Sequence, residues 1–321
     1  EFLARFGFGG VLADDMGLGK TIQLLARLLQ RKEEAADAPS LVVAPASLVL
    51  NWREEARHFA PQLQIVTHVG PNRSSRAEDL QQADLVVTTY GVLRMDTDLL
   101  QNIRIDYAVV DDSQAIKNHQ SKTFQAARTL QSRHRLCLTG TPLENNLAEL
   151  WSQMDFLNPG LLRSSSHFEQ TLAAPARKGD ARAGESLRRL IKPFILRRTK
   201  EQVAPELPDK TEHILTCPMR RQQSDLYRRI LSHYRESVLQ SVDTQGMNKS
   251  KIKVLEGLLR LRQIACHPGL VDPKGTDSGK MDKLHELVRE VRSGGHKALV
   301  FSQYTKLLRL IKQEFDELEL P

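Results

Sequence analysis

Short apolar runs alternate with helical patterns along the first half of the chain. The runs that have the length and character of buried strands are Gly10–Ala13, Leu41–Ala44, Leu85–Thr88, Tyr107–Val110 and Arg135–Leu138. After the first of them, Ile22, Leu25, Leu28 and Leu29 recur at helical spacing. This alternation predicts an α/β fold whose mainly parallel sheet is covered by helices on both faces. In such sheets ligands bind beyond the carboxyl ends of the strands, so the segments that follow these runs are the first places to look for chemistry.

A glycine-rich turn follows the first run, in the stretch Val11-Leu-Ala-Asp-Asp-Met-Gly-Leu-Gly-Lys-Thr21. Glycines let backbone N–H groups point inward, and the next helix offers its positive N-terminal end. In a phosphate loop of this kind, Lys20 reaches the β- and γ-phosphates and the hydroxyl of Thr21 ligates Mg²⁺. The expected nucleotide-binding residues are Met16, Gly17, Leu18, Gly19, Lys20 and Thr21.

The loop departs from the strict phosphate-loop pattern because Asp14 stands at its first glycine position. Taken alone, the match is therefore moderate, and a helix that happens to begin with Gly and Lys would share it. The buried strand before the loop and the amphipathic helix after it favour the nucleotide site.

Two further runs are followed by polar turns. Asp111 and Asp112 come directly after Tyr107–Val110, and Thr139-Gly-Thr141 follows Arg135–Leu138. Adjacent acids in a turn are ordinarily solvated, but acids that follow a buried strand emerge at the same sheet edge as the phosphate loop. One can hold the metal shell while the next orients the water that attacks the γ-phosphate.

Composition narrows the class of protein. The chain has 321 residues, 40% of them hydrophobic, which suits about two ordinary domains. No apolar run has the length of a membrane span, and Cys137, Cys217 and Cys266 form no C-x-x-C pair. We therefore expect no membrane partner, no disulfide framework and a reducing compartment, which is the cytoplasm of a bacterium, in association with the nucleoid, or the nucleus of a eukaryote.

Positive charge is concentrated in one segment. The chain carries a net charge of +7, and residues 177–235 hold fifteen Lys and Arg against seven Asp and Glu. Such a surplus is either a solvated helical face or a site for a phosphate backbone. The sequence favours neither explanation over the other.

Taken together, the motifs resemble the Swi/Snf-type ATPases of helicase superfamily two, over nearly the whole chain. Besides the phosphate loop, the matching segments are Val43–Leu48 with Asn51-Trp52, Thr88-Thr-Tyr90, Asp111–Asn118, Leu138–Asn145, Phe194-Ile-Leu-Arg-Arg-Thr-Lys200, Leu261–Pro268, Ser278-Gly-Lys280 and Lys297–Tyr304. They occur in the order found in that family. The composition favours a bacterial member.

The resemblance implies two RecA-like lobes that close on ATP and move along duplex DNA, with Mg²⁺ as cofactor. By position, Thr21 and Asp111 would hold the metal, and Asp111, Asp112 and Lys20 would act in catalysis. Gln114, Thr139, Gly140 and Thr141 would couple nucleotide to DNA. Pro45, Ser47, Thr88, Thr89 and Tyr90 are the expected contacts to DNA phosphates, which makes binding salt-dependent and indifferent to sequence. Other DNA-bound proteins are further candidate partners, and nothing in the sequence indicates an oligomeric state.

The expected organisation is an N-terminal ATP-binding lobe over residues 1–195 and an incomplete second lobe over 196–321. A helical insertion at about 218–268 carries an amphipathic helix from Met219 to about Val242, and Asp243–Ser250 reads as a loop. Lys297–Tyr304 is expected to open the second lobe with a strand. Trp52 and Trp151 lie in apolar helical patterns and are interpreted as core anchors.

Two departures from the family limit the expected activity. The family has Glu where this chain has Asp112, and a carboxylate withdrawn by about 1–1.5 Å can cost about a hundredfold in rate. The chain also ends before the motifs that supply arginine fingers, each worth about 10³–10⁵ in rate. We expect the chain to bind nucleotide weakly and hydrolyse it poorly.

Rival functions remain open at this point. A DNA-binding scaffold or ATP-gated clamp that does not hydrolyse ATP would also explain the basic surplus and Asp112. A small-molecule kinase would share the phosphate loop, but the other motifs would then be present by coincidence. A strand-separating helicase would have the same fold.

Overall fold

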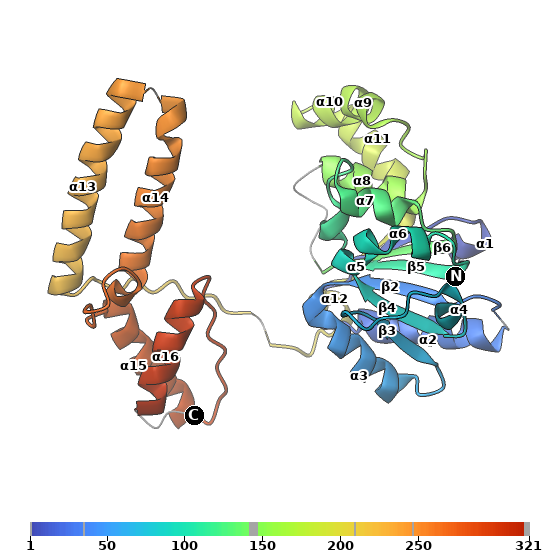
Figure 1. Ribbon diagram of the computed structural model, residues 1–321, viewed down its shortest axis with the longest axis horizontal. Helices are drawn as coiled ribbons and strands as arrows, with labels where there is room; N and C mark the ends of the chain where they lie inside the picture. Colours follow the sequence, from blue (N-terminus) through green and yellow to red (C-terminus); the bar gives the residue numbers. More distant parts are fainter. Residues whose placement is uncertain (1, 35, 141–146, 209, 246, 318–321) are drawn as a thin grey trace. The chain divides into compact units, whose positions relative to one another are not determined.

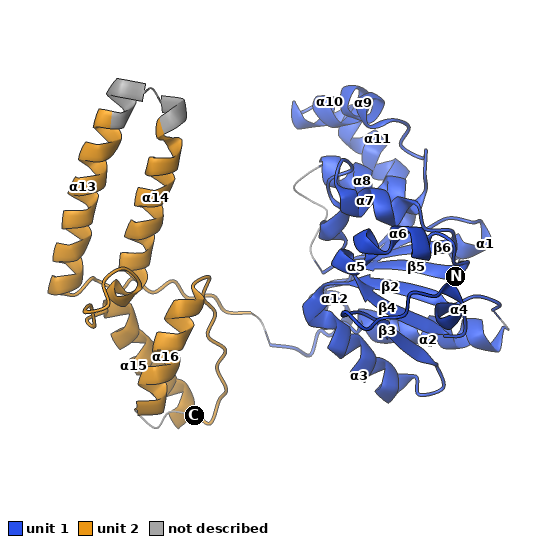
Figure 2. Cartoon of the chain, viewed as in Figure 1, with its two compact units in different colours: residues 1–209 blue, residues 210–321 orange. Residues whose placement is uncertain are grey.

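The computed structural model describes residues 2–34, 36–140, 147–208, 210–245 and 247–317. The chain divides into two compact units, residues 1–209 and 210–321 (Figure 2). The lobe boundary expected after residue 195 falls inside a strand that pairs within unit 1. Assignment of the units as lobes of a motor stays a prediction.

Unit 1 is built on a seven-stranded sheet (Figure 1). Its strands are β1 (Gly10–Leu12), β2 (Ser40–Ala44), β3 (Ile65–His68), β4 (Leu85–Thr89), β5 (Ile105–Asp111), β6 (Ser132–Leu138) and β7 (Ile195–Leu196), in the order β3-β4-β2-β5-β6-β1-β7. Every pairing between them is parallel. The predicted parallel α/β sheet is confirmed.

Helices cover both faces of the sheet (Figure 1). One face carries α2 (Lys20–Glu33) and α3 (Val49–Phe59); the other carries α5 (Tyr90–Met95), α7 (Lys122–Arg128) and α8 (Leu147–Leu157). Strand side chains alternate between these two cores: Val42 and Val109 pack toward α2 and α3, whereas Val43 and Val110 pack toward α7 and α8. The apolar runs lack polar alternation because both faces of the strands are buried.

The remaining helices of unit 1 are short connectors apart from α11. They are α1 (Phe2–Arg5), α4 (Ala77–Gln81), α6 (Thr97–Leu100), α9 (Ser165–Phe168), α10 (Ala174–Arg177), α11 (Ala181–Ile191) and α12 (Lys200–Val203). Single turns η1 (Ala46–Leu48), η2 (Ser113–Ile116), η3 (Glu169–Ala173) and η4 (Lys192–Phe194) complete the unit.

The regular secondary structure in the described part of unit 2 consists of helices joined by irregular segments. It contains α13 (Arg221–Gln245), α14 (Met247–Cys266), the turn η5 (Pro268–Leu270), α15 (Gly279–Ser293) and α16 (Thr305–Glu317). The first two helices form a hairpin in which the ring of Tyr234 packs against the backbone of Gly257, where an added Cβ would lie 3.0 Å from the ring. The Tyr234 hydroxyl donates to Glu256 at 3.0 Å. The helical insertion expected at about 218–268 thus contains α13 and α14.

Two local predictions in unit 2 were wrong. The loop expected over Asp243–Ser250 is mostly helix, because α13 continues to Gln245 and α14 begins at Met247. The strand expected near Lys297–Tyr304 is absent, and Leu299 and Phe301 are exposed. A strand needs a hydrogen-bonding neighbour, and the described part of unit 2 provides none.

Within the described residues, no helix is both long enough and apolar enough to span a membrane.

The buried core of the sheet predicts how substitutions change the free energy of unfolding. Leu85 in β4 is fully buried, whereas Leu50 on α3 is 62% exposed. We expect Leu85→Ala to lower the free energy of unfolding by about 2–5 kcal/mol because it leaves a cavity. Leu50→Ala is the matched control, with an expected change within about 0.5 kcal/mol. Denaturant unfolding of both variants checks this, and equal losses would contradict the assigned core.

Candidate functional site

The last residues of the central strands lie in one row. Leu138 of β6 pairs with Leu12 of β1 on one side and with Asp111 of β5 on the other. Leu12 also pairs with Leu196 of β7. Because all these strands are parallel, the phosphate loop, the acidic pair and the Thr139-Gly140 turn emerge side by side from the same edge. The register therefore builds the site that the motifs suggested.

The phosphate loop has the backbone conformation that its glycines allow. Gly17 and Gly19 have φ of +90° and +69°, in the region that non-glycine residues rarely adopt, and Gly19 directly precedes α2. The ammonium of Lys20 donates to the carbonyl oxygens of Asp14 and Asp15 at 2.6 and 3.1 Å. These carbonyls hold the lysine at the loop, where a phosphate would meet it.

Gly140 brings the third motif against the phosphate loop. A Cβ on Gly140 would lie 2.6 Å from the Cγ of Met16 and 3.7 Å from the Nζ of Lys20. Neighbouring Thr139 is buried, and its N–H donates to the carbonyl of Leu12 at 3.1 Å. Any larger residue at position 140 would push against the loop. Thr141, also expected here, lies outside the described residues.

Asp111 is held by hydrogen bonds to both of its carboxylate oxygens. The indole N–H of Trp52 donates to Oδ2 at 2.7 Å, and the N–H of Asp112 donates to Oδ1 at 3.0 Å. Burial raises the pKa of Asp111, and the Trp52 hydrogen bond opposes that shift. Trp52 is a core anchor, as predicted from its apolar surroundings, and it also orients the first acid. The sequence did not reveal this second role.

Asp112 has a left-handed backbone, with φ of 55° and ψ of 67°. Such a conformation costs a non-glycine residue about 1–2 kcal/mol, although Asp tolerates it better than most residues. The Tyr90 hydroxyl donates to the carbonyls of Asp111 and Asp112, at 2.5 and 3.3 Å. Tyr90 thus ties the segment after β4 to the acidic turn. Strain held in place by its surroundings is typical of functional sites.

The three motifs line one cavity of about 590 Å³. Its predicted members are Met16, Gly17, Gly19, Lys20, Thr21, Asp111, Asp112, Thr139 and Gly140. The wall is completed by Ile22, Leu48, Asn51, Trp52, Glu55 and Leu138. Glu55 accepts a 2.7 Å hydrogen bond from the amide of Asn51. Sequence reasoning missed Glu55, whose only signal was its place one helical turn after Asn51.

The charges at this edge suit a nucleotide with its metal. Burial lowers the pKa of Lys20, and Asp14, Asp111 and Asp15 oppose the shift. Thr21 and Asp111 line the same cavity. In the described residues no group of three or more His, Cys, Asp or Glu could hold a metal alone.

The residues predicted to contact DNA differ in whether their side chains are accessible. Ser47 is exposed on η1, next to Pro45, and Thr89 caps α5 by accepting from the N–H of Val92 at 3.2 Å. Thr88 is fully buried, and its hydroxyl donates to the carbonyl of His68 at 2.8 Å. A phosphate contact through the hydroxyl of Thr88 is therefore not supported. Gln114, expected to couple the sites, is exposed on η2 just after the acids.

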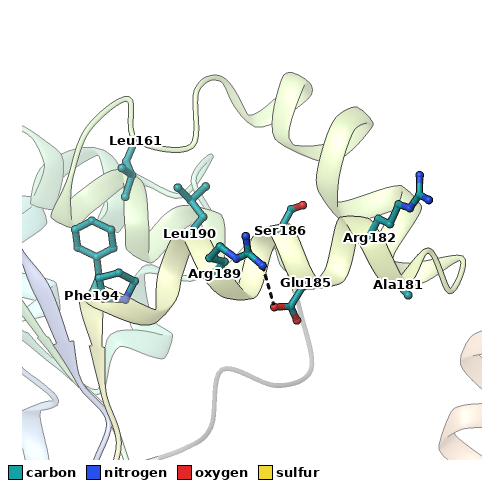
Figure 3. A pocket seen from close by; sticks show the side chains of 9 residues that line it. Leu161, Ala181, Arg182, Glu185, Ser186, Arg189, Leu190 and Phe194 are labelled. Atoms are coloured by element: carbon teal, nitrogen blue, oxygen red, sulfur yellow. Dashed lines mark ion pairs between the residues drawn. The ribbon is translucent and has the colours of Figure 1, made fainter.

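A larger cavity, of about 910 Å³, lies elsewhere in unit 1, along α11 (Figure 3). Leu161, Leu190 and Phe194 form its apolar wall, and Glu185 pairs with Arg189 at 3.8 Å. This cavity is not at the carboxyl ends of the sheet strands, and its side chains do not include the acids or the phosphate loop. Size alone does not mark the nucleotide site.

Comparison with known proteins decides the family. The model of the SNF2-related domain matches residues 4–270. The chain belongs to the SNF2-related family. Among curated proteins it is 38% identical to "Putative ATP-dependent helicase/translocase YwqA" of Bacillus subtilis (strain 168), over 97% of this chain and 35% of the relative. It is 33% identical to a human SWI/SNF-related regulator of chromatin, subfamily A member 1, over 95% of this chain and 31% of the relative.

Solved structures agree with the SNF2-related fold. The SWI2/SNF2 ATPase core of Sulfolobus solfataricus in complex with double-stranded DNA is 40% identical, with a TM-score of 0.63, over 98% of this chain and 67% of that one. The SNF2-related chain spans about a third of the length of these curated relatives. The α/β sheet of unit 1 is thus the RecA-like sheet expected for the family.

The Trp52–Asp111 hydrogen bond gives a prediction for this SNF2-related site. Trp52→Phe removes the indole donor that opposes the effect of burial, so the pKa of Asp111 should rise further above its usual value. Carboxyl-carbon NMR titration measures it. Trp151→Phe is the control, because the Trp151 indole donates to the Arg163 carbonyl instead. An unchanged Asp111 pKa in Trp52→Phe would show that this donor does not set it.

Proposed function

We propose that the chain is the ATP-binding motor core of a double-stranded DNA translocase. The observation that supports this is the convergence of the phosphate loop, the acidic pair and the Thr139-Gly140 turn on one cavity. The family model and the relatives named as ATP-dependent helicases or translocases point the same way. The DNA-bound archaeal relative supports duplex DNA as partner.

In transfer of the γ-phosphoryl group to water, different residues of the cavity bind the phosphates, hold the metal and orient the water. The loop amides and Lys20 bind the phosphates, and Lys20 exchanges its two carbonyl contacts for phosphate oxygens. Thr21 and Asp111 would hold Mg²⁺, which, when bound, neutralises charge on the β- and γ-phosphate oxygens. Asp112 orients the water whose oxygen attacks the γ-phosphorus while the bond to the bridging oxygen breaks and ADP leaves.

Coupling between nucleotide and DNA runs through the turns beside the acids. Tyr90 follows β4 and binds the carbonyls of Asp111 and Asp112. Ser47 lies on η1 after β2, and Thr89 lies at the end of β4, where it caps α5. Both would contact DNA phosphates, together with the backbone near Pro45. Gln114, Thr139, Gly140 and Thr141 would sense the γ-phosphate. A displacement of the turn after β4 by DNA would therefore move the acidic turn.

The first experiment measures phosphate release from ATP, with and without duplex DNA, on the chain and on a longer protein extended through a complete second lobe. We expect DNA-stimulated, Mg²⁺-dependent release in the longer protein and weak release from the chain. Lys20→Gln should lower the rate by at least about 100-fold, because it removes a positive charge from the developing phosphate charge. Removing Mg²⁺ with EDTA should abolish release.

The controls separate the rival functions. DNA binding that ignores ATP, with no release in either protein, would contradict a motor and support a scaffold. Bound ATP that alters DNA affinity without hydrolysis would instead identify an ATP-gated clamp. Strand separation of a duplex would identify a helicase. DNA affinity that falls steeply with salt is expected for phosphate contacts.

A second prediction concerns the length of the Asp112 side chain. Asp112→Glu extends the carboxylate by about 1–1.5 Å, and we expect turnover in the longer, extended protein to rise by about 100-fold. Some stability should be lost, because Glu tolerates the left-handed backbone less well than Asp. Asp112→Asn is the control, since it keeps the length and removes the charge. Steady-state turnover that stays at the original level in Asp112→Glu would show that reach does not limit the reaction.

A further inference from the structure

The carboxylate of Asp14 is completely buried at the base of the phosphate loop. It stands where a strict phosphate loop has glycine, so the loop carries a charge that its phosphate contacts do not require. A buried carboxylate is costly unless it is paired and hydrogen-bonded. Its partners therefore show what the charge does in this fold.

Arg198 provides most of those partners. Its guanidinium contacts both carboxylate oxygens, with Nη2 at 2.5 Å from Oδ2 and Nε at 3.1 Å from Oδ1. Its backbone N–H also donates to Oδ1, at 3.0 Å. Burial would raise the pKa of Asp14, but the hydrogen bonds from Arg198 outweigh it, and the pKa lies below the usual value. The pair is therefore charged at neutral pH.

Gln23 closes the network across the loop. Its amide nitrogen donates to Asp14 at 3.3 Å and to the carbonyl of Leu18 at 3.0 Å, and its oxygen accepts from Arg198 at 2.6 Å. The start of the loop and the first turn of α2 are thus joined through the guanidinium of Arg198, and the amide of Gln23 adds the middle of the loop. Few rearrangements of the loop would leave this network intact.

The backbone after β7 runs along the loop as well. The N–H of Ala13 donates to the carbonyl of Leu196, that of Asp15 to the carbonyl of Arg198, and that of Lys200 to the carboxylate of Asp15, at 2.7, 3.1 and 3.1 Å. Lys20 is bound to the carbonyls of Asp14 and Asp15. The position of the segment after β7 therefore fixes the position of the catalytic lysine. This segment is also the one that leads out of unit 1.

We propose that Arg198 is a positioning residue for nucleotide binding: through Asp14 it holds the phosphate loop in its binding shape and ties it to the segment after β7. This inference rests on the proposed use of ATP at the loop. Arg198 does not touch the nucleotide itself. Its effect on the phosphates passes through Asp14, Gln23 and the loop backbone.

The test uses a double variant in which neither residue 14 nor residue 198 is charged. This variant separates positioning of the phosphate loop from stabilisation of the fold. Arg198→Gln alone leaves a buried carboxylate without its cation, so the melting temperature and nucleotide affinity should both fall. Adding Asp14→Asn removes that charge, and the amide oxygen at position 14 can still accept from the backbone N–H of residue 198. We expect the double variant to regain most of the melting temperature. Its dissociation constant for a fluorescent ATP analogue should stay at least tenfold higher than that of the original chain. This tenfold change corresponds to a loss of about 1.4 kcal/mol of binding free energy.

Hydrogen exchange of the amides of residues 13–23 gives a readout that needs no nucleotide. Exchange should be faster in Arg198→Gln and in the double variant than in Lys192→Gln, a control that removes an exposed positive charge from the same region. A double variant with original affinity, or with unchanged exchange in the loop, would overturn the proposal. If the original chain binds no nucleotide, the proposed function fails, and the exchange rates still decide whether Arg198 holds the loop.

Discussion

Parallel pairing in register is the constraint on which the rest of this structure depends. Leu12, Leu138 and Asp111 share one row of the sheet, so three turns from distant parts of the sequence begin at the same edge. Because β1, β2, β4 and β5 are buried on both faces, a slip in register would place their side chains in the wrong core. The cores packed against α2 and α3 and against α7 and α8 therefore secure the site as well as the fold.

Asp14 and Lys20, at the two ends of the phosphate loop, differ in the kind of group that binds their charge. Asp14 is buried and fully paired with Arg198, which makes it a fixed structural charge. Among the described residues, Lys20 donates to the backbone carbonyls of Asp14 and Asp15, which phosphate oxygens can replace. The loop thus combines a rigid base with an exchangeable binding group. Preorganisation of this kind limits the free energy spent on ordering the loop when a ligand binds.

The acidic turn shows how one contact can serve both packing and chemistry. Trp52 fills the core under α3 while its indole N–H orients Asp111. Tyr90 is the first residue of α5, directly after β4, and its hydroxyl donates to the carbonyls of the acidic turn. The apolar helical pattern around Trp52 predicted its burial correctly, whereas Tyr90 was predicted only as a DNA contact. The polar atom on each ring found a partner on another strand, which no local pattern could indicate.

The sequence by itself determined the parallel sheet, the phosphate loop and the acids at one edge, because apolar periodicity and turn chemistry are local properties. It also gave the family by its motifs. Only the tertiary structure decided that Arg198 pairs with Asp14, that Trp52 and Tyr90 hold the acidic turn, and that Thr88 faces inward. The helical hairpin over the expected loop and the missing strand near Leu299 were decided there too. Hydrogen-bond partners and strand neighbours are distant in sequence, so local composition cannot specify them.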